Sequence, residues 1–268
     1  MTTQDTFISH LIELRDRLLR AIVAILLVFL VLFFYPGAGA IYDFLAAPLM
    51  HALPEGSKMI ATGVITPFLV PVKVTAMVAF MVALPYVLYQ AWAFVAPGLY
   101  SHEKKLILPL VFASTALFLL GIGFAYYFVF GKVFTFINQF APKSITPAPD
   151  IEAYLGFVLT MFIAFGVTFE IPVAVVVLAR MGIVSVDQLK QARPYVIVGA
   201  FVVAAVVTPP DVVSQLLLAI PMVVLYELGI VLARFVARPA GETDHRPMSD
   251  AEMDRELDRT DAERERLK

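Results

Sequence analysis

A charged stretch, HLIELRDRLLR at residues 10–20, stands directly before the first long apolar run. On a helix, His10, Glu13, Arg17 and Arg20 share one face, opposite an apolar stripe. A carboxylate on that face can bind a guanidinium or ammonium group. The alternative is an amphipathic helix that lies on the membrane surface and leads into a span. In that case Glu13 and Arg17 form only an i,i+4 pair worth a few tenths of a kcal/mol.

A second group with chemical potential is an acid inside an apolar run. Glu170 lies ten residues before Arg180, so it is roughly 15 Å from that end of its span and near mid-bilayer. Ionisable groups at that depth are costly and indicate function by default, such as a proton site. The alternative is a hydrogen-bonded acid that fixes helix packing beside the bend expected at Pro172. The sequence alone leaves both interpretations open.

Other polar groups occupy the apolar runs near their ends. The amides of Gln90 and Gln215 can hydrogen-bond a neighbouring helix within lipid, either in the same chain or in another subunit. Asp211 follows Thr208-Pro209-Pro210, a pattern typical of the residue that caps the next helix. Glu227 lies near the end of the last run, where it snorkels or pairs with Arg234.

The composition excludes most enzyme and metal chemistry. The chain has 268 residues, no cysteine and four histidines, so we expect no disulfide, no thiol nucleophile and no metal or other cofactor. The sequence contains neither an HExxH nor a G-x-S-x-G motif, and it has no P-loop. Because 60% of the residues are hydrophobic and only 16% are charged, we predict an all-α membrane protein with several spans and no nucleic-acid partner.

The apolar runs predict six membrane spans within residues 1–238. A short surface helix, IYDFLAAPLMHAL, is predicted between the first two, and Pro85 predicts a kink in the second. Residues 242–268 carry ten acids and six bases, so we predict a charged, disordered tail over 239–268. The predicted spans are 18–35, 67–95, 106–130, 154–181, 195–208 and 212–233.

The distribution of Lys and Arg predicts the orientation of the chain. Ten of them flank the spans on the side that holds both termini, and four lie on or near the opposite side. Both termini are therefore predicted to be cytoplasmic. The ten are Arg15, Arg17, Arg20, Lys104, Lys105, Arg180, Lys190, Arg193, Arg234 and Arg238, and the four are Lys58, Lys73, Lys132 and Lys143.

The fifth span is unusually short. Pro194 and Pro209 bracket about fourteen residues, which reach roughly 21 Å of a hydrocarbon core about 30 Å thick. The sixth span is long enough but is interrupted by Pro221. We therefore expect a locally thinned membrane beside these two spans.

Four long motifs in sequence order resemble one family. The chain from about residue 7 to residue 237 resembles the TatC subunit of the twin-arginine protein translocase. The resemblance implies a concave, glove-like bundle of six transmembrane helices in the inner membrane of a bacterium, with short helices five and six. It implies a receptor without enzymatic activity that binds twin-arginine signal peptides and nucleates export of folded proteins by the proton-motive force. The motifs are HLIELRDRLLR, WAFVAPGLYSHEKK, AFGVTFEIPVA and RPYVIVGAFVVAAVVTPPDVVSQLLLAIPM.

The resemblance implies a signal-peptide site in which two carboxylates, Glu13 and Glu103, lie close together. A guanidinium matches a carboxylate with two parallel hydrogen bonds, and a lysine loses that geometry. Lys105 stands where relatives often have arginine, so the positive charge is kept but the planar guanidinium with its two parallel donors is lost. The implied site also includes Leu14, Arg15, Arg17, Phe94 and Pro97.

The resemblance also implies sites within the membrane and beyond it. Pro85 and Glu170 would line the concave inner face, and Pro48 lies in the first external loop. The single-span partner subunits TatA and TatB would dock on spans five and six, and other copies of the chain would complete an oligomeric receptor. A proton-coupled transporter that uses Glu170 remains the alternative, although we find no paired broken helices in inverted repeats. The implied docking residues are Gln215, Val203, Val206 and Thr208.

Overall fold

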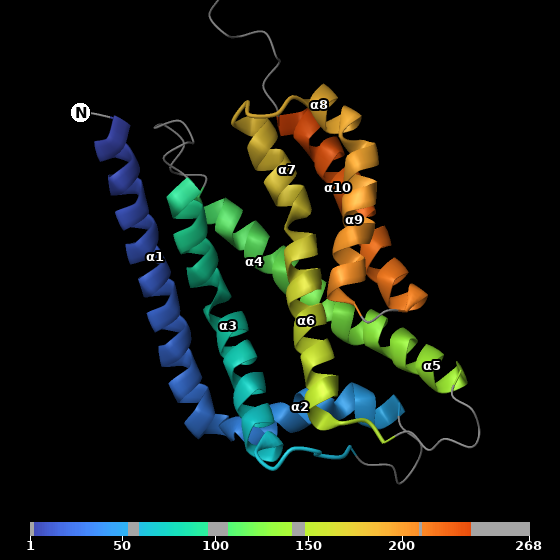
Figure 1. Cartoon of the computed structure of the whole chain (residues 1–268). Helices are drawn as coiled ribbons and strands as arrows, with labels where there is room; N and C mark the ends of the chain where they lie inside the picture. Colours follow the sequence, from blue (N-terminus) through green and yellow to red (C-terminus); the bar gives the residue numbers. More distant parts are fainter. Residues whose placement is uncertain (1–2, 53–58, 96–106, 141–147, 209–210, 237–268) are drawn as a thin grey trace, which may run out of the picture.

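The structure is a computed structural model, and it describes residues 3–52, 59–95, 107–140, 148–208 and 211–236. The described chain is almost entirely helical (Figure 1). Five helices are long and apolar enough to cross a membrane, and a sixth, shorter apolar helix accompanies them. The helices are α1 (Thr3–Leu32), α2 (Ala38–Ala52), α3 (Thr66–Val95), α4 (Ile107–Phe124), α5 (Phe130–Phe140), α6 (Ile151–Phe169), α7 (Ile171–Arg180), α8 (Val186–Gln191), α9 (Arg193–Val207) and α10 (Val212–Val236).

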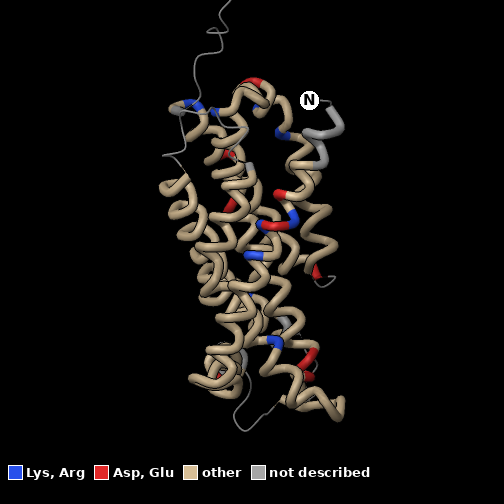
Figure 2. Tube along the Cα trace, turned by 90° about the vertical axis from the view of Figure 1, so that its left-hand side faces the viewer, with Lys and Arg blue, Asp and Glu red and all other residues tan. Residues whose placement is uncertain are grey.

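The two ends of the bundle differ in what they carry. At the upper end in Figure 1, α1 begins and α10 ends beside α8, whereas α2 and the beginning of α6 lie at the lower end. Lys and Arg gather toward the upper end and are fewer below (Figure 2). This distribution agrees with the predicted orientation, which itself stays a prediction. The tail over 239–268 lies outside the described residues.

The first helix differs from the prediction. The sequence predicted an amphipathic helix on the membrane surface that leads into the first span, but both stretches belong to one continuous helix of 30 residues, α1. It ends where Tyr35 adopts extended backbone angles (φ −147°, ψ 122°) and Gly37 a positive φ of 99°. The chain then turns into α2, which lies across the lower end and confirms the helix predicted in the first loop (Figure 1).

The centre of the bundle is the crossing of α4 and α6. Gly121 packs against the backbone of Phe165, and Gly166 packs against the ring of Phe118, so a side chain at either glycine would clash. Small residues at such a crossing let two helices approach closely within a membrane. Fully buried aromatic side chains, including Phe130 and Phe162, fill the neighbouring core.

Two proline positions have different outcomes. The helix α3 continues through Pro71 and Pro85 without interruption. The fourth span is divided at Glu170 into α6 and α7, and Pro172 occupies the first turn of α7, where a missing N–H costs little. The bend predicted at Pro172 thus falls at Glu170 itself.

The last two helices confirm two predictions and correct a third. The helix α9 has 15 residues, about 22 Å, and stops above α5 in Figure 1; thinning of the membrane beside it stays a prediction. Asp211 caps α10, because its carboxylate accepts the backbone N–H of Ser214 at 2.7 Å. Glu227 binds Arg193 of α9 at 2.7 Å rather than Arg234.

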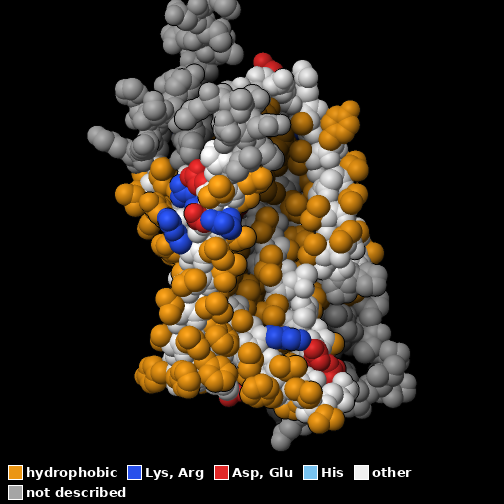
Figure 3. Space-filling model, turned by 60° about the vertical axis from the view of Figure 1, so that its left-hand side comes forward, with side chains coloured by type: hydrophobic (Ala, Val, Ile, Leu, Met, Phe, Trp, Pro, Cys, Tyr) orange, Lys and Arg blue, Asp and Glu red, His pale blue; other side chains and the backbone are white. Residues whose placement is uncertain are grey.

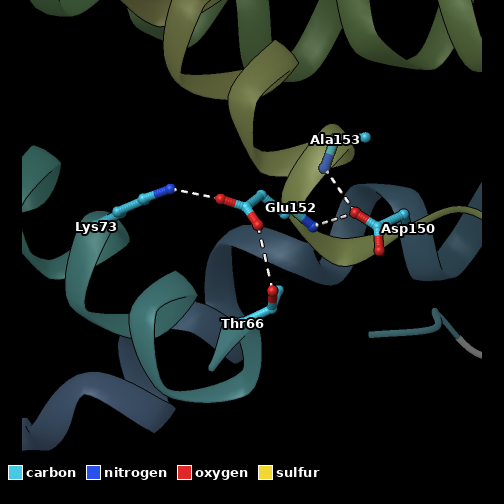
Figure 4. A network of polar contacts seen from close by, with 5 residues as sticks. All are labelled: Thr66, Lys73, Asp150, Glu152 and Ala153. Carbon is cyan, nitrogen blue, oxygen red and sulfur yellow. Dashed lines mark hydrogen bonds and ion pairs between the residues drawn. The ribbon is translucent and has the colours of Figure 1, made fainter. Parts of the chain in front are cut away.

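A polar network joins three segments at the lower end (Figure 4). Lys73 of α3 donates to Glu152 of α6 at 2.7 Å, and the Thr66 hydroxyl donates to the other carboxylate oxygen at 3.2 Å. Asp150 accepts the backbone N–H groups of Glu152 at 2.9 Å and Ala153 at 3.0 Å, which caps α6. These bonds fix where α6 begins relative to α3.

Asp150 also holds the loop that precedes α3. It accepts the backbone N–H of Thr62 at 3.1 Å and the Thr62 hydroxyl at 2.7 Å. Ile60 and Ile151 add a backbone hydrogen bond of 2.9 Å between the same segments. The hydrogen bond from Ala153 N–H, followed by the Thr62 hydroxyl, holds the pKa of Asp150 below its ordinary value.

Candidate functional site

The centre of the charged stretch is an ion pair within α1. Arg17 donates to one oxygen of Glu13 twice, from Nε at 2.9 Å and from Nη2 at 2.6 Å. The Arg17 side chain is 23% exposed and that of Glu13 is 35% exposed. The spacing of four residues along a helix predicted this pair. The structure thus places a guanidinium of the same helix on Glu13.

The upper end of α3 lies against this part of α1. The His10 ring stacks on the Phe94 ring with 4.6 Å between centroids and 33° between planes. His10 Nδ1 lies 4.0 Å from the second oxygen of Glu13. The structure therefore brings Phe94 of α3 close to Glu13 of α1. Pro97 and Glu103 belong to residues 96–106, outside the described residues.

Arg15 and Leu14 are more exposed than Glu13, and neither of them contacts it through a hydrogen bond or ion pair that the structure shows among the described residues. Arg15 donates to Asp16 from Nε at 3.0 Å and from Nη2 at 2.8 Å, and its side chain is 65% exposed. Leu14 is also exposed. The face that includes α1 carries one cluster of charged side chains near the upper end and a smaller group below, on a mostly hydrophobic surface (Figure 3).

Glu170 belongs to a polar group that the sequence did not predict. The Trp92 indole N–H of α3 donates to the Ser114 hydroxyl of α4 at 3.0 Å, and Ser114 lies near the Glu170 carboxyl. One oxygen of Glu170 is buried and has no partner among the described residues. Three helices thus meet at one acid. Trp92 is the only tryptophan in the sequence, and that was the available signal.

The structure places the two prolines implied by the resemblance on helices. Pro85 is exposed on α3, and Pro48 lies within α2. Gln90 is 5% exposed, and its side-chain oxygen has no partner among the described residues.

The implied docking surface divides into exposed and buried residues. Val206 is 81% exposed and Val203 is 43% exposed on α9. The Gln215 amide donates to the Phe201 carbonyl at 3.3 Å, so it links α10 to α9 within the chain. Thr208 is buried, and its hydroxyl donates to the Ala204 carbonyl at 2.8 Å. The two valines therefore face outward, whereas Thr208 does not.

These features together define a class of protein. Five long apolar helices and one shorter one make a multi-span helical membrane protein, with more of its Lys and Arg toward the end where the chain begins than toward the other (Figure 2). Among the described residues, no three His, Cys, Asp or Glu side chains are grouped so that they could hold a metal ion.

The comparisons with known proteins identify the family. The sequence model of the Sec-independent protein translocase protein (TatC) matches residues 9–221. The chain therefore belongs to the TatC family, a family of translocase components and not of enzymes. Family membership decides against a proton-coupled transporter as the function.

Individual relatives agree along most of their length. The TatC protein of Haemophilus influenzae is 53% identical over 228 residues, covering 85% of this chain and 88% of the relative. The TatC protein of Escherichia coli K12 is 51% identical over 237 residues, covering 88% of this chain and 91% of the relative. The crystal structure of a twin-arginine translocase receptor TatC matches with a TM-score of 0.76 at 38% identity, covering 85% of this chain and all of that structure.

Proposed function

We propose that this chain is the receptor subunit that binds the twin-arginine motif of signal peptides through Glu13 and Glu103. The observation that carries the proposal is the state of Glu13. One of its oxygens accepts two hydrogen bonds from the Arg17 guanidinium, which supports a site where an arginine of the ligand binds the same carboxylate. Phe94 contacts His10 beside it, and α3 ends at Val95, directly before the segment that contains Glu103.

In the proposed binding step, an arginine of the signal peptide forms a hydrogen-bonded ion pair with Glu13. An incoming arginine would either take the second oxygen of Glu13 or replace Arg17 on the first. Either step keeps a charge-assisted hydrogen bond, so the carboxylate is never left unpaired. A lysine offers a point charge without the planar fork, so it would replace Arg17 poorly. This difference is our physical basis for selecting paired arginines.

Partner subunits are proposed for a different surface. The outward valines, Val203 and Val206, are suited to a single transmembrane helix of TatA or TatB, with Gln215 beside them as a polar contact. Glu170 and Pro85 would act on the inner face, and Pro48 in the external loop. We further propose an oligomeric receptor in the inner membrane of a bacterium, with both termini cytoplasmic, that supports export of folded proteins driven by the proton-motive force.

The decisive experiment is peptide binding to the purified full-length protein in detergent. A peptide with two consecutive arginines should bind more tightly than its twin-lysine version, and Glu103→Gln should remove most of that preference. Glu152→Gln at the lower end is the matched control, because it removes one carboxylate far from the proposed site. Equal binding of the two peptides, or an unchanged preference in Glu103→Gln, would refute the proposed site.

A further inference from the structure

A groove separate from the Glu13 pair lies between α1 and α3. It has a volume of about 440 Å³ and is lined by Leu19, Arg20, Val23, Ala24 and Leu27 of α1 and by Tyr86 of α3. Four of these residues are apolar, and the two polar ones each carry a hydrogen-bond donor. The groove therefore combines an apolar channel with a cation and a phenol.

Of the three arginines that the structure describes on α1, Arg20 is the one that forms no ion pair with Glu13 or Asp16 of the same helix. Asp16, one turn earlier, accepts both bonds from Arg15 on one of its two oxygens, Oδ1, and within the described chain no hydrogen bond or ion pair joins it to Arg20. Glu13 accepts both bonds from Arg17. Within the described residues Arg20 has neither a hydrogen bond nor an ion pair, and its side chain is exposed.

The position of Arg20 along α1 sets its depth in the membrane. Arg20 precedes Leu32, the last residue of α1, by twelve residues, or roughly 18 Å. A hydrocarbon core is about 30 Å thick, so Arg20 lies in the half nearer the start of α1. An arginine there extends its head toward the phosphate layer while its stem stays in apolar surroundings.

We infer that this groove binds an anionic phospholipid of the leaflet near the start of α1. The lipid phosphate accepts the two parallel N–H bonds of the Arg20 guanidinium, and the Tyr86 hydroxyl donates to the phosphate or the adjoining ester. An acyl chain lies along Val23, Ala24 and Leu27. A lipid is favoured over a transmembrane helix because the helix would need an acid at this depth to neutralise Arg20.

The test is native mass spectrometry of the delipidated full-length protein after addition of phosphatidylglycerol or, separately, phosphatidylcholine. We expect one phosphatidylglycerol to be retained in preference to phosphatidylcholine. Arg20→Gln should weaken that retention by about tenfold or more, the size expected from losing a charge-assisted hydrogen bond. Arg20→Lys keeps the charge but loses the fork, so it should weaken retention less.

Two further variants separate the groove from a general effect of charge. Lys132→Gln removes a cation that stacks over Phe128 at the lower end and should leave the retained lipid unchanged. Ala24→Phe fills the groove without touching the cation, so it should weaken retention even if Arg20→Gln fails to fold.

Three results would overturn the inference. These are equal retention of the two lipids, an equal loss in Lys132→Gln and Arg20→Gln, and unchanged retention in Ala24→Phe. Displacement of phosphatidylglycerol by a single-span peptide with an acid at the depth of Arg20, without any preference between the lipids, would assign the groove to a helix instead.

Discussion

The carboxylates of α1 at the upper end and those at the lower end of the bundle differ in the partners that they bind. At the upper end, Glu13 binds an arginine four residues away on the same helix, and Asp16 binds the adjacent Arg15. At the lower end, Asp150 binds Thr62 across 88 residues of sequence, and Glu152 binds Lys73 across 79. The two pairs on α1 are local to one helix, whereas the lower ones connect different segments of the chain, as the Arg193–Glu227 pair between α9 and α10 also does.

This difference separates binding from architecture. Opening the Glu13–Arg17 pair leaves every helix contact in place, because both residues remain on α1. Opening the Asp150 contacts removes the cap of α6 and also frees the loop around Thr62. A ligand can therefore exchange with the upper pair at little cost to the fold, whereas the lower network is a structural connection.

The largest effect is expected from Glu13→Gln. The variant should lose about 2 kcal/mol of affinity for a twin-arginine peptide, the low end for a paired charge because Glu13 is partly exposed. Its thermal midpoint should stay close to that of the original chain. Titration calorimetry and thermal unfolding of the same preparation measure both quantities. A large fall in the midpoint with intact affinity would reverse the roles that we assign to the two ends.

The second effect is expected from Asp150→Asn at the lower end. An amide accepts fewer and weaker hydrogen bonds than a carboxylate, so both the cap of α6 and the Thr62 contact weaken. The thermal midpoint should fall by several degrees, while affinity for the twin-arginine peptide stays unchanged. Asp187→Asn is a suitable control, because that carboxylate binds only Lys190 of its own short helix among the described residues. A loss of peptide affinity in Asp150→Asn would show that the two ends are coupled.

Most of the fold could be predicted from local patterns in the sequence. Apolar runs predicted the five long apolar helices, and the proline brackets predicted the short α9. The Glu13–Arg17 pair and the Asp211 cap also followed from spacing alone. Each of these features depends on residues within one or two turns of one another, so a single sequence contains the information.

Contacts between distant segments could not be predicted. Trp92, Ser114 and Glu170 come from three helices, and nothing in their spacing brings them together. The sequence offered either snorkelling or a pair with Arg234 for Glu227, and it missed Arg193 of the neighbouring helix, the actual partner, for the same reason. The sequence also could not predict which residues at the end of α9 are exposed. Val206 is exposed, whereas Thr208, directly after the helix, is buried.

A smaller effect is expected from acid. The pKa of Asp150 is held below its ordinary value of 3.8 in the folded chain. Its contribution to stability is therefore complete above about pH 3.8 and is lost as the pH falls through the lower folded value. Thermal midpoints measured from pH 5 downward should fall less steeply in Asp150→Asn than in the original chain. Identical pH profiles would remove Asp150 from the structural network.

The smallest effect is expected from the exposed pair at the same end. Lys73 and Glu152 lie 2.7 Å apart, but their side chains are 47% and 51% exposed, so solvent screens most of their attraction. In a double-mutant cycle of Lys73→Gln and Glu152→Gln, we expect the thermal midpoints to be nearly additive. Each single variant should lower the midpoint less than Asp150→Asn does. A strong departure from additivity would mean that the ion pair, rather than the Asp150 cap, holds α3 against α6, and the lower network would then depend on charge more than on hydrogen bonds to the backbone.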